Sequence, residues 1–298
     1  MKNDNILVSV VCDVYNHEPY LRQCFDGFVM QKTNFKFEVL VHDDASTDKS
    51  AEIIIEYTNK YPDIFKPIIQ KENQYSKGVG IWKTYQFPRV KGKYVAFCEG
   101  DDYWTDPLKL QSQVDCLEKD KTFSCCFSSV RWVDKSGIKL AGTFPPRQTS
   151  FCLGTITLEV FLKEDFAKGK WSIQLSGFMV RAEVDKTFRR MLRGPLKKYP
   201  FGDYPLFITA FLLGNCYFIG EEMSCYRVMS GGYNSQMQAN ISKAVENQNK
   251  IKAAMVDIDN YTKGKYHSCF QKNMLWCDLN IFYMKNKTYH KKKILIVF

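Results

Sequence analysis

Strand and helix patterns alternate along the first hundred residues of the chain, and this alternation limits the fold more than any other feature. Helical spacing of apolar side chains spans residues 19–30 and 48–61. Nearly continuous apolar runs, typical of buried strands, occupy residues 6–14, 37–41, 65–70 and 94–98. Such strands joined by helices indicate a mostly parallel sheet covered by helices on both faces. The sequence therefore predicts an α/β fold.

The pattern changes after residue 110. Helices are predicted over residues 107–118 and 203–213, strands over 123–133, 172–180 and 223–228, and two helical patterns from 236 to 283. We therefore expect one domain over residues 1–230, with halves 1–110 and 111–230. A helical C-terminal extension over residues 231–298 follows it.

The net charge of +10 is unevenly distributed. Residues 1–110 carry 14 Lys and Arg against 16 Asp and Glu, whereas residues 111–298 carry 28 against 16. Because the basic excess belongs to the second part alone, a uniformly basic nucleic-acid-binding protein is disfavoured and no nucleic-acid partner is expected.

Polar residues follow the predicted strands at the point where each strand ends. In parallel α/β sheets, ligands bind at the carboxyl ends of the strands. The residues placed there are Tyr15 and Asn16, Asp43 and Asp44, and Glu99, Asp101 and Asp102. The sequence therefore predicts a binding site at this edge of the sheet.

Residues 99–102 are the sharpest signal, because three carboxylates in four residues repel one another unless a cation lies among them. Hard divalent ions take oxygen ligands and keep positions open for phosphate oxygens. The three carboxylates are thus predicted to surround a divalent ion such as Mn²⁺ or Mg²⁺, with a solvated acidic turn as the alternative.

The segment over residues 43–48 has two predicted roles. Ser46 or Thr47 is expected to cap the helix that follows. The carboxylates of Asp43 and Asp44 can accept a hydrogen bond from a nucleotide base. Further along the chain, Lys77 lies in a glycine-containing loop and can approach a pyrophosphate, although a flexible surface loop is an equal alternative.

Together these motifs resemble glycosyltransferase family 2, inverting nucleotide-sugar transferases with the GT-A fold. The resemblance covers residues 6–120 and includes the Gly92-Lys93-Tyr94 segment before the acidic motif. It implies that Asp43 or Asp44 contacts the base, and that Asp101 and Asp102 form the metal and ribose site. Glu99 stands where the family usually has the first Asp of that motif.

The second half resembles the family more weakly. The segment Gly202-Asp203-Tyr204 matches the stretch where the family places its catalytic base, which implies that Asp203 deprotonates the acceptor. Met229 stands where many relatives have a metal-assisting His. Since a thioether is a poor ligand for a hard cation, the metal is expected to rely on carboxylates, phosphate and water. The resemblance implies a nucleoside-diphosphate sugar donor and a saccharide or lipid-linked saccharide acceptor.

Two other functions stay open. A sugar nucleotidylyltransferase uses a similar sheet and a metal, but it needs a Gly-rich, Arg-containing phosphate loop that residues 15–19 lack. A non-catalytic basic binding protein would need exposed aromatic side chains on its basic surface.

No secretory signal and no apolar stretch of ~18 residues is present, so a cytoplasmic protein is expected. Lys291, Lys292 and Lys293 stand beside the apolar residues 294–298. This tail is expected either to contact the inner face of a membrane weakly or to pack on the domain as a last strand or helix.

Overall fold

The computed structural model describes residues 5–147, 151, 153–163, 172–200, 202–229 and 240–286. Its strands are β1 Ile6–Val14, β2 Lys36–Asp43, β3 Phe65–Ile69, β4 Tyr94–Phe97, β5 Tyr103–Trp104, β6 Phe123–Val133, β7 Lys139–Phe144, β8 Gly154–Ile156, β9 Phe178–Arg181 and β10 Asn215–Arg227. Its helices are α1 Glu18–Val29, α2 Ser50–Lys60, α3 Lys109–Lys119, α4 Leu158–Phe161, α5 Val184–Arg193, α6 Asp203–Leu213, α8 Ile241–Tyr261 and α9 His267–Asn286. Short helical turns are η1 Tyr75–Lys77, η2 Trp82–Gln86, η3 Phe87–Arg89 and η5 Leu175–Gly177.

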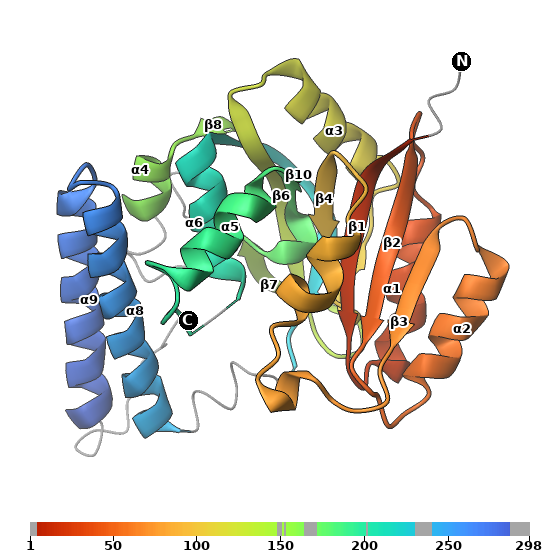
Figure 1. The fold of residues 1–298 in the computed structure, drawn as a ribbon, viewed down its shortest axis with the longest axis horizontal. Helices are drawn as coiled ribbons and strands as arrows, with labels where there is room; N and C mark the ends of the chain where they lie inside the picture. Colours follow the sequence, from red (N-terminus) through yellow and green to blue (C-terminus); the bar gives the residue numbers. More distant parts are fainter. Residues whose placement is uncertain are drawn as a thin grey trace.

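The strands form one ten-stranded mixed sheet in the order β3-β2-β1-β4-β9-β6-β10-β5, with β7 beside β6 and β8 beside β10 (Figure 1). Strands β3, β2, β1 and β4 are parallel neighbours, as the βα alternation predicts. Antiparallel β9 joins this half to the long parallel pair of β6 and β10. The predicted α/β architecture is therefore confirmed.

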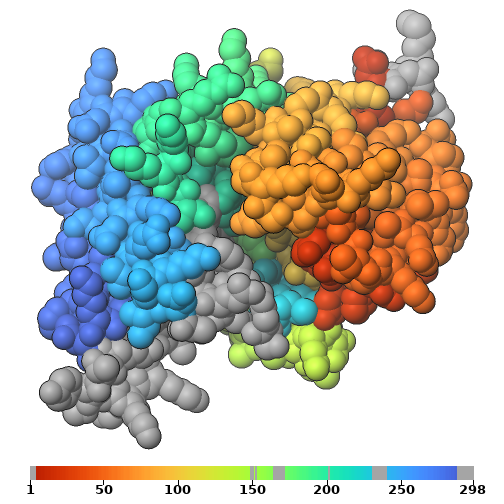
Figure 2. All heavy atoms as spheres, turned by 60° about the horizontal axis from the view of Figure 1, so that its bottom comes forward, coloured from red at the N-terminus to blue at the C-terminus, as the bar shows by residue number. Residues whose placement is uncertain are grey.

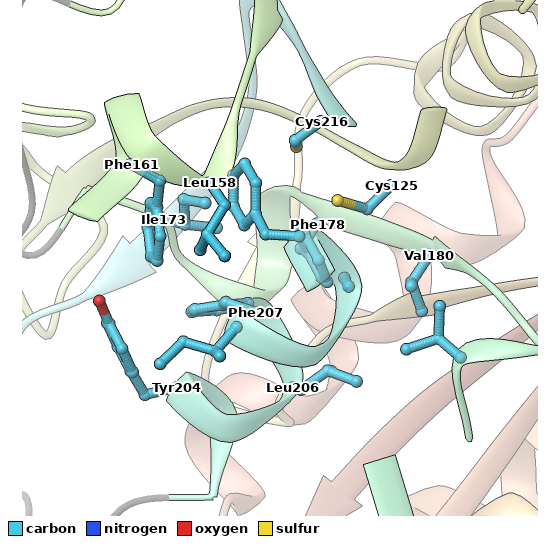
Figure 3. Close-up of a cluster of buried hydrophobic side chains, with 14 of the residues drawn as sticks. Cys125, Leu158, Phe161, Ile173, Phe178, Val180, Tyr204, Leu206, Phe207 and Cys216 are labelled. Atoms are coloured by element: carbon cyan, nitrogen blue, oxygen red, sulfur yellow. The ribbon is translucent and has the colours of Figure 1, made fainter. Parts of the chain in front are cut away.

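Each face of the sheet carries its own hydrophobic core. Apolar side chains of α1, α2 and α3 cover one face, where Phe25 and Phe28 are fully buried. On the other face, α4 and α6 pack against β6, β9 and β10, with the rings of Phe161, Phe178 and Phe207 inside (Figure 3). Each such ring contributes ~1.5 to 3 kcal/mol of burial free energy relative to an exposed one.

The C-terminal helices share the second core. Ile251 and Met255 of α8 and Phe270 and Cys277 of α9 belong to the same buried cluster as α4 and α6. At the end of the molecule opposite β1, β2 and β3, the two helices lie side by side (Figure 2). We therefore propose that residues 231–298 form a C-terminal extension whose described part, residues 240–286, packs on the domain formed by residues 1–230.

No helix in the described part of the chain combines the length and apolarity needed to cross a membrane. The predicted tail, residues 291–298, lies outside the described residues.

Two strands differ from their predicted ranges. Residues 223–228 are only the end of β10, which begins at Asn215, because pairing with both β6 and β8 overrides its polar interruptions. Of residues 172–180, only those from Phe178 onward form β9. Gln174 accepts the Leu175 N–H at 2.7 Å through its side chain, which turns the chain into η5 instead.

Gly92 precedes β4 where no side chain fits. A Cβ there would lie 2.5 Å from the backbone nitrogen of Ser9 and 2.8 Å from the carbonyl oxygen of Tyr94. Gly92→Ala should therefore lower the free energy of unfolding by about 2 kcal/mol or more, measured by urea denaturation. Gly80→Ala, whose Cβ would meet only the Lys83 Cβ at 3.9 Å, is the matched control. Equal stability of the two variants would contradict this account.

Candidate active site

The carboxyl ends of β1, β2 and β4 lie together because the three strands are parallel neighbours. Val14 is level with Asp43 in the β1–β2 pairing, and Val11 is level with Phe97 in the β1–β4 pairing. The polar loops after these strands therefore meet at one edge of the sheet, as expected from the sequence.

The loops after β1 and β2 are cross-linked by hydrogen bonds. Asn16 adopts a φ of 56°, a left-handed conformation that Asn tolerates better than most residues. Its backbone N–H donates to the Ser46 hydroxyl at 2.9 Å, and its side-chain oxygen accepts the Thr47 N–H at 2.7 Å. The Glu18 N–H donates to an Asp48 carboxylate oxygen at 3.0 Å. These bonds hold both loops in a fixed relation.

The prediction that Ser46 or Thr47 caps α2 is wrong. The helix begins at Ser50, and Lys49 occupies the cap position without a side-chain capping bond. Ser46 and Thr47 bond to Asn16 across the loops instead. Tyr15, beside this junction, is left 46% exposed.

Asp43 and Asp44 are buried at the end of β2, and both bond to the protein. Asp43 accepts from the backbone N–H and the hydroxyl of Ser46, and burial raises the pKa of its carboxyl. Asp44 accepts the N–H groups of Gln74 and Tyr75 at 2.7 and 2.9 Å, which fixes the loop before η1. Each carboxylate oxygen has a second lone pair, so the contact with a nucleotide base stays a prediction.

Lys77 lies at the end of η1, where its ammonium group forms an ion pair with Glu72. Both side chains are exposed. A bound pyrophosphate would have to share or displace this pair, and the contact stays a prediction.

The acidic segment after β4 forms a tight turn. The Gly100 N–H donates to the Asp13 carbonyl at 3.0 Å, and the Asp102 N–H donates to the Glu99 carbonyl at 3.0 Å. A Cβ on Gly100 would lie 2.7 Å from Nδ1 of His17. A glycine is therefore needed for the turn to approach α1 this closely.

Asp101 and Asp102 lie in different surroundings. Asp102 is buried, and its two oxygens accept the backbone N–H of Arg227 at 2.9 Å and the side-chain amide of Gln174 at 3.3 Å. Burial and the nearby charge of Asp101 raise the pKa of Asp102 well above its usual range. Asp101 is half-exposed, and no described residue donates a hydrogen bond to its carboxylate.

Arg227, at the end of β10, holds the acidic turn in place through hydrogen bonds from its guanidinium group. Its Nε donates to the Asp101 carbonyl at 2.9 Å, and another guanidinium nitrogen donates to the Lys135 carbonyl at 3.0 Å. A third reaches the Gln23 side chain in α1 at 2.8 Å. One buried side chain thus joins the acidic turn to α1 and to the β6–β7 connection.

Asp13, which the sequence did not single out, lies beside the turn near the end of β1. Its oxygens accept the indole N–H of Trp82 at 2.8 Å and the side-chain amide of Gln86 at 2.6 Å. Burial raises the pKa of its carboxyl to about 6. A carboxylate interrupting the apolar run of β1 was the one signal that could have identified it.

Asp203 is the first residue of α6, where the sequence predicts the helix to begin. One carboxylate oxygen accepts the Tyr204 N–H at 3.0 Å, and burial raises the pKa of the side chain to about 6. Its charge also reaches the acidic turn: desolvation and the charges of Asp101, Asp102, Asp203 and Asp13 raise the pKa of Glu99 well above its usual range, although Glu99 keeps an exposed surface. The fold therefore brings Asp203 near the acidic turn from a distant part of the sequence.

These carboxylates fit an open cation site. In the described part of the chain, no three His, Cys, Asp or Glu side chains form a metal-binding group. Asp101 is half-exposed, accepts no hydrogen bond from the residues that the structure describes, and lies in a region of concentrated negative charge. A divalent ion that also takes phosphate oxygens and water needs only one or two protein carboxylates. The residues present suit such an ion beside a bound diphosphate.

The chain resembles known proteins over its first half. Residues 9–169 match the family described as Glycosyl transferase family 2. An uncharacterized protein of Mycobacterium tuberculosis is 43% identical over 141 residues, 47% of this chain and 39% of that protein. The putative glycosyltransferase EpsE of Bacillus subtilis is 29% identical over 164 residues, 52% of this chain and 57% of that protein. The alignments thus span about two fifths to three fifths of these relatives.

Solved structures resemble nearly the whole chain. TarS residues 1–349 of S. aureus, in complex with UDP-GlcNAc, has a TM-score of 0.67 at 18% identity, over 95% of this chain and 74% of that one. The mannosyltransferase PcManGT of Pyrobaculum calidifontis, in complex with GDP-Man and Mn²⁺, has a TM-score of 0.58 at 14% identity, over 96% and 76%. At these identities the likeness shows a shared fold.

The raised pKa of Asp203 predicts a pH-dependent gain in stability when its charge is removed. The folded chain holds this proton more tightly than the unfolded chain, so the parent loses stability as the pH rises from about 4 to about 6. Asp203→Asn has no carboxyl group at this position, so it should not lose stability over this pH range. Its free energy of unfolding, measured by urea denaturation, should exceed that of the parent by about 2 kcal/mol at pH 8 and should equal it at pH 4. Asp63→Asn, at an exposed site, is the control for the general effect of removing one carboxylate. A pH-independent difference for Asp203→Asn would contradict this explanation.

Proposed function

This chain belongs to glycosyl transferase family 2, and we propose that it transfers a sugar from a nucleoside-diphosphate sugar to an acceptor hydroxyl with inversion at the anomeric carbon. Its fold is GT-A, as the sequence analysis expected. The observation that carries the proposal is the placement of Asp203 beside the acidic turn, close enough for its charge to raise the pKa of Glu99. A donor-binding acidic turn and a separate acceptor-side acid are the two parts that such a transfer requires.

In the proposal, the loops that follow β1 and β2 bind the sugar-nucleotide donor. Tyr15 and Asn16 lie next to Asp43 and Asp44 because the two loops are cross-linked. In the proposal, Asp43 or Asp44 accepts a hydrogen bond from the base, and the exposed ring of Tyr15 covers the nucleoside. Lys77, in the turn that Asp44 fixes, leaves Glu72 to contact the pyrophosphate.

The two predicted metal ligands take different roles in the proposal. Asp101 would hold Mn²⁺ or Mg²⁺, since its carboxylate is accessible and accepts no hydrogen bond from the described residues. Asp102 positions the turn, since both of its oxygens already accept protein hydrogen bonds. When bound, the ion neutralises the charge that develops on the departing diphosphate.

Asp203 is the proposed general base. With a pKa near 6, its carboxylate is mostly ionised at neutral pH and still basic enough to accept a proton. It takes the proton of the acceptor hydroxyl while that oxygen bonds to the anomeric carbon. The bond from this carbon to the diphosphate breaks on the opposite face, and the diphosphate leaves with the electron pair.

The donor and acceptor classes rest on relatives and neighbours. Solved structures of similar fold hold UDP-GlcNAc or GDP-Man. A relative from Escherichia coli, 31% identical over 142 residues (47% of this chain and 52% of that protein), is named as a glucosyltransferase that uses UDP-Glc and GlcNAc-diphosphoundecaprenol. We propose a saccharide or a lipid-linked saccharide as acceptor, in polysaccharide or glycoconjugate biosynthesis.

Metal removal tests the role of Asp101. EDTA should abolish transfer, and Mn²⁺ or Mg²⁺ should restore it, because an uncompensated diphosphate is a poor leaving group among carboxylates. Asp101→Asn should raise the metal concentration needed for half-maximal activity by about tenfold or more, and Asp102→Asn should raise it much less. Full activity of Asp101→Asn in EDTA would refute the assignment.

Asp203→Asn separates binding from chemistry, because Asn keeps the shape of the side chain but cannot take the proton. Donor affinity, measured by calorimetry, should stay near that of the parent while turnover falls ~100-fold or more. Asp185→Asn, in the first turn of α5, is the matched control and should turn over normally. If Asp203→Asn stays within a few-fold of the parent, Asp203 is structural, and Glu221 and Glu222 become the next candidates.

A further inference from the structure

Helix α9 carries apolar side chains on two opposite faces. Its inner face buries Cys269, Phe270, Cys277 and Met284, and the first three of these side chains belong to the same core as α4 and α6. Its outer face exposes four large apolar side chains: Leu275 at 62%, Leu279 at 49%, Phe282 at 62% and Tyr283 at 53%. We call these four residues the outer stripe.

The spacing of the outer stripe aligns it along the helix. Positions i, i+4, i+7 and i+8 lie on one side of an α-helix. The helix forms an edge of the molecule (Figures 1 and 2). A helix that is apolar on both sides normally has a neighbour on each, and the described part of the chain supplies only the inner one.

Positive charge lies at both ends of the outer stripe. Lys263 and Lys265 are exposed in the α8–α9 turn, Lys272 lies near the start of α9, and Lys285 lies at its end. None of the four pairs with an acid of the described chain.

This charge pattern argues against a second copy of the chain as the partner. If two α9 helices packed in parallel, Lys272 and Lys285 would each meet their equals. If they packed antiparallel, Lys285 would approach Lys263, Lys265 and Lys272 of the other copy. Like charges meet in both arrangements, whereas an anionic surface attracts both ends of the stripe.

We propose that the outer face of α9 binds the surface of an anionic lipid bilayer. The outer stripe enters the boundary between headgroups and acyl chains, and the lysines at its ends contact lipid phosphates. The contact goes beyond the proposed transfer reaction. It also differs from anchoring by the tail, because the apolar part belongs to a folded helix.

Vesicle sedimentation of the full chain tests the proposal. The chain should bind vesicles of phosphatidylcholine and phosphatidylglycerol, bind pure phosphatidylcholine more weakly, and dissociate at high salt. The triple variant Leu275→Gln/Leu279→Gln/Phe282→Gln should bind at least about tenfold more weakly, since it loses the apolar contact. The double variant Ile55→Gln/Ile138→Gln removes exposed apolar side chains elsewhere and should bind like the parent.

Two further measurements separate the alternatives. A chain ending at Asn286 should keep part of its binding, and the triple variant of that shorter chain should lose it. Undiminished binding of the full-length triple variant would overturn the proposal and leave the tail as the anchor. A dimer seen by analytical ultracentrifugation that the triple variant abolishes would also overturn it, in favour of a second copy. The rate of transfer to a water-soluble acceptor should be the same in the parent and the triple variant. A failure of the bilayer proposal can therefore be distinguished from a failure of the proposed transfer reaction.

Discussion

The hydrogen bond between the Arg227 backbone N–H and the Asp102 carboxylate is the contact on which the rest of the site depends. It joins the turn after β4 to the end of β10 across 125 residues of sequence. The Arg227 guanidinium extends the connection, because it donates to the carbonyls of Asp101 and Lys135 and to the side chain of Gln23. Within the acidic turn, Arg227 contacts only the backbone carbonyl of Asp101 and the buried carboxylate of Asp102. The side chain of Asp101 is left accessible while the turn is held rigid.

The cost of this arrangement is electrostatic. Asp13, Glu99, Asp102 and Asp203 all have raised pKa values: burial is the main cause for Asp13, Asp102 and Asp203, and desolvation together with neighbouring carboxylates for the exposed Glu99. Crowded, desolvated acids lower the stability of the folded chain above about pH 6. Shifted pKa values of this kind are typical of functional sites. In the proposed reaction, a divalent ion would relieve part of the repulsion, so that ligand binding and local stability are coupled.

The two halves of the chain contribute differently to the site. The parallel half supplies the cross-linked loops at the ends of β1 and β2, and its rigidity comes from bonds such as that between Thr47 and Asn16. The second half supplies Asp203 on α6, a helix that is buried against β6 and β9 and against the C-terminal helices. In the proposals, α9 would bring a bilayer to this same half, which would suit an acceptor carried on a lipid.

The sequence alone determined the parallel half of the fold, the acidic turn and the start of α6. Each of these depends on local information: apolar runs, helical spacing, or charged residues adjacent in the chain. Tertiary structure alone decided that Ser46 bonds to Asn16 instead of capping α2, that Asp13 borders the acidic turn, and that Asp102 is bound by Gln174 and Arg227. These choices depend on which buried polar groups find partners after folding. The partners lie from 30 to 125 residues apart, where local sequence carries no signal of their pairing.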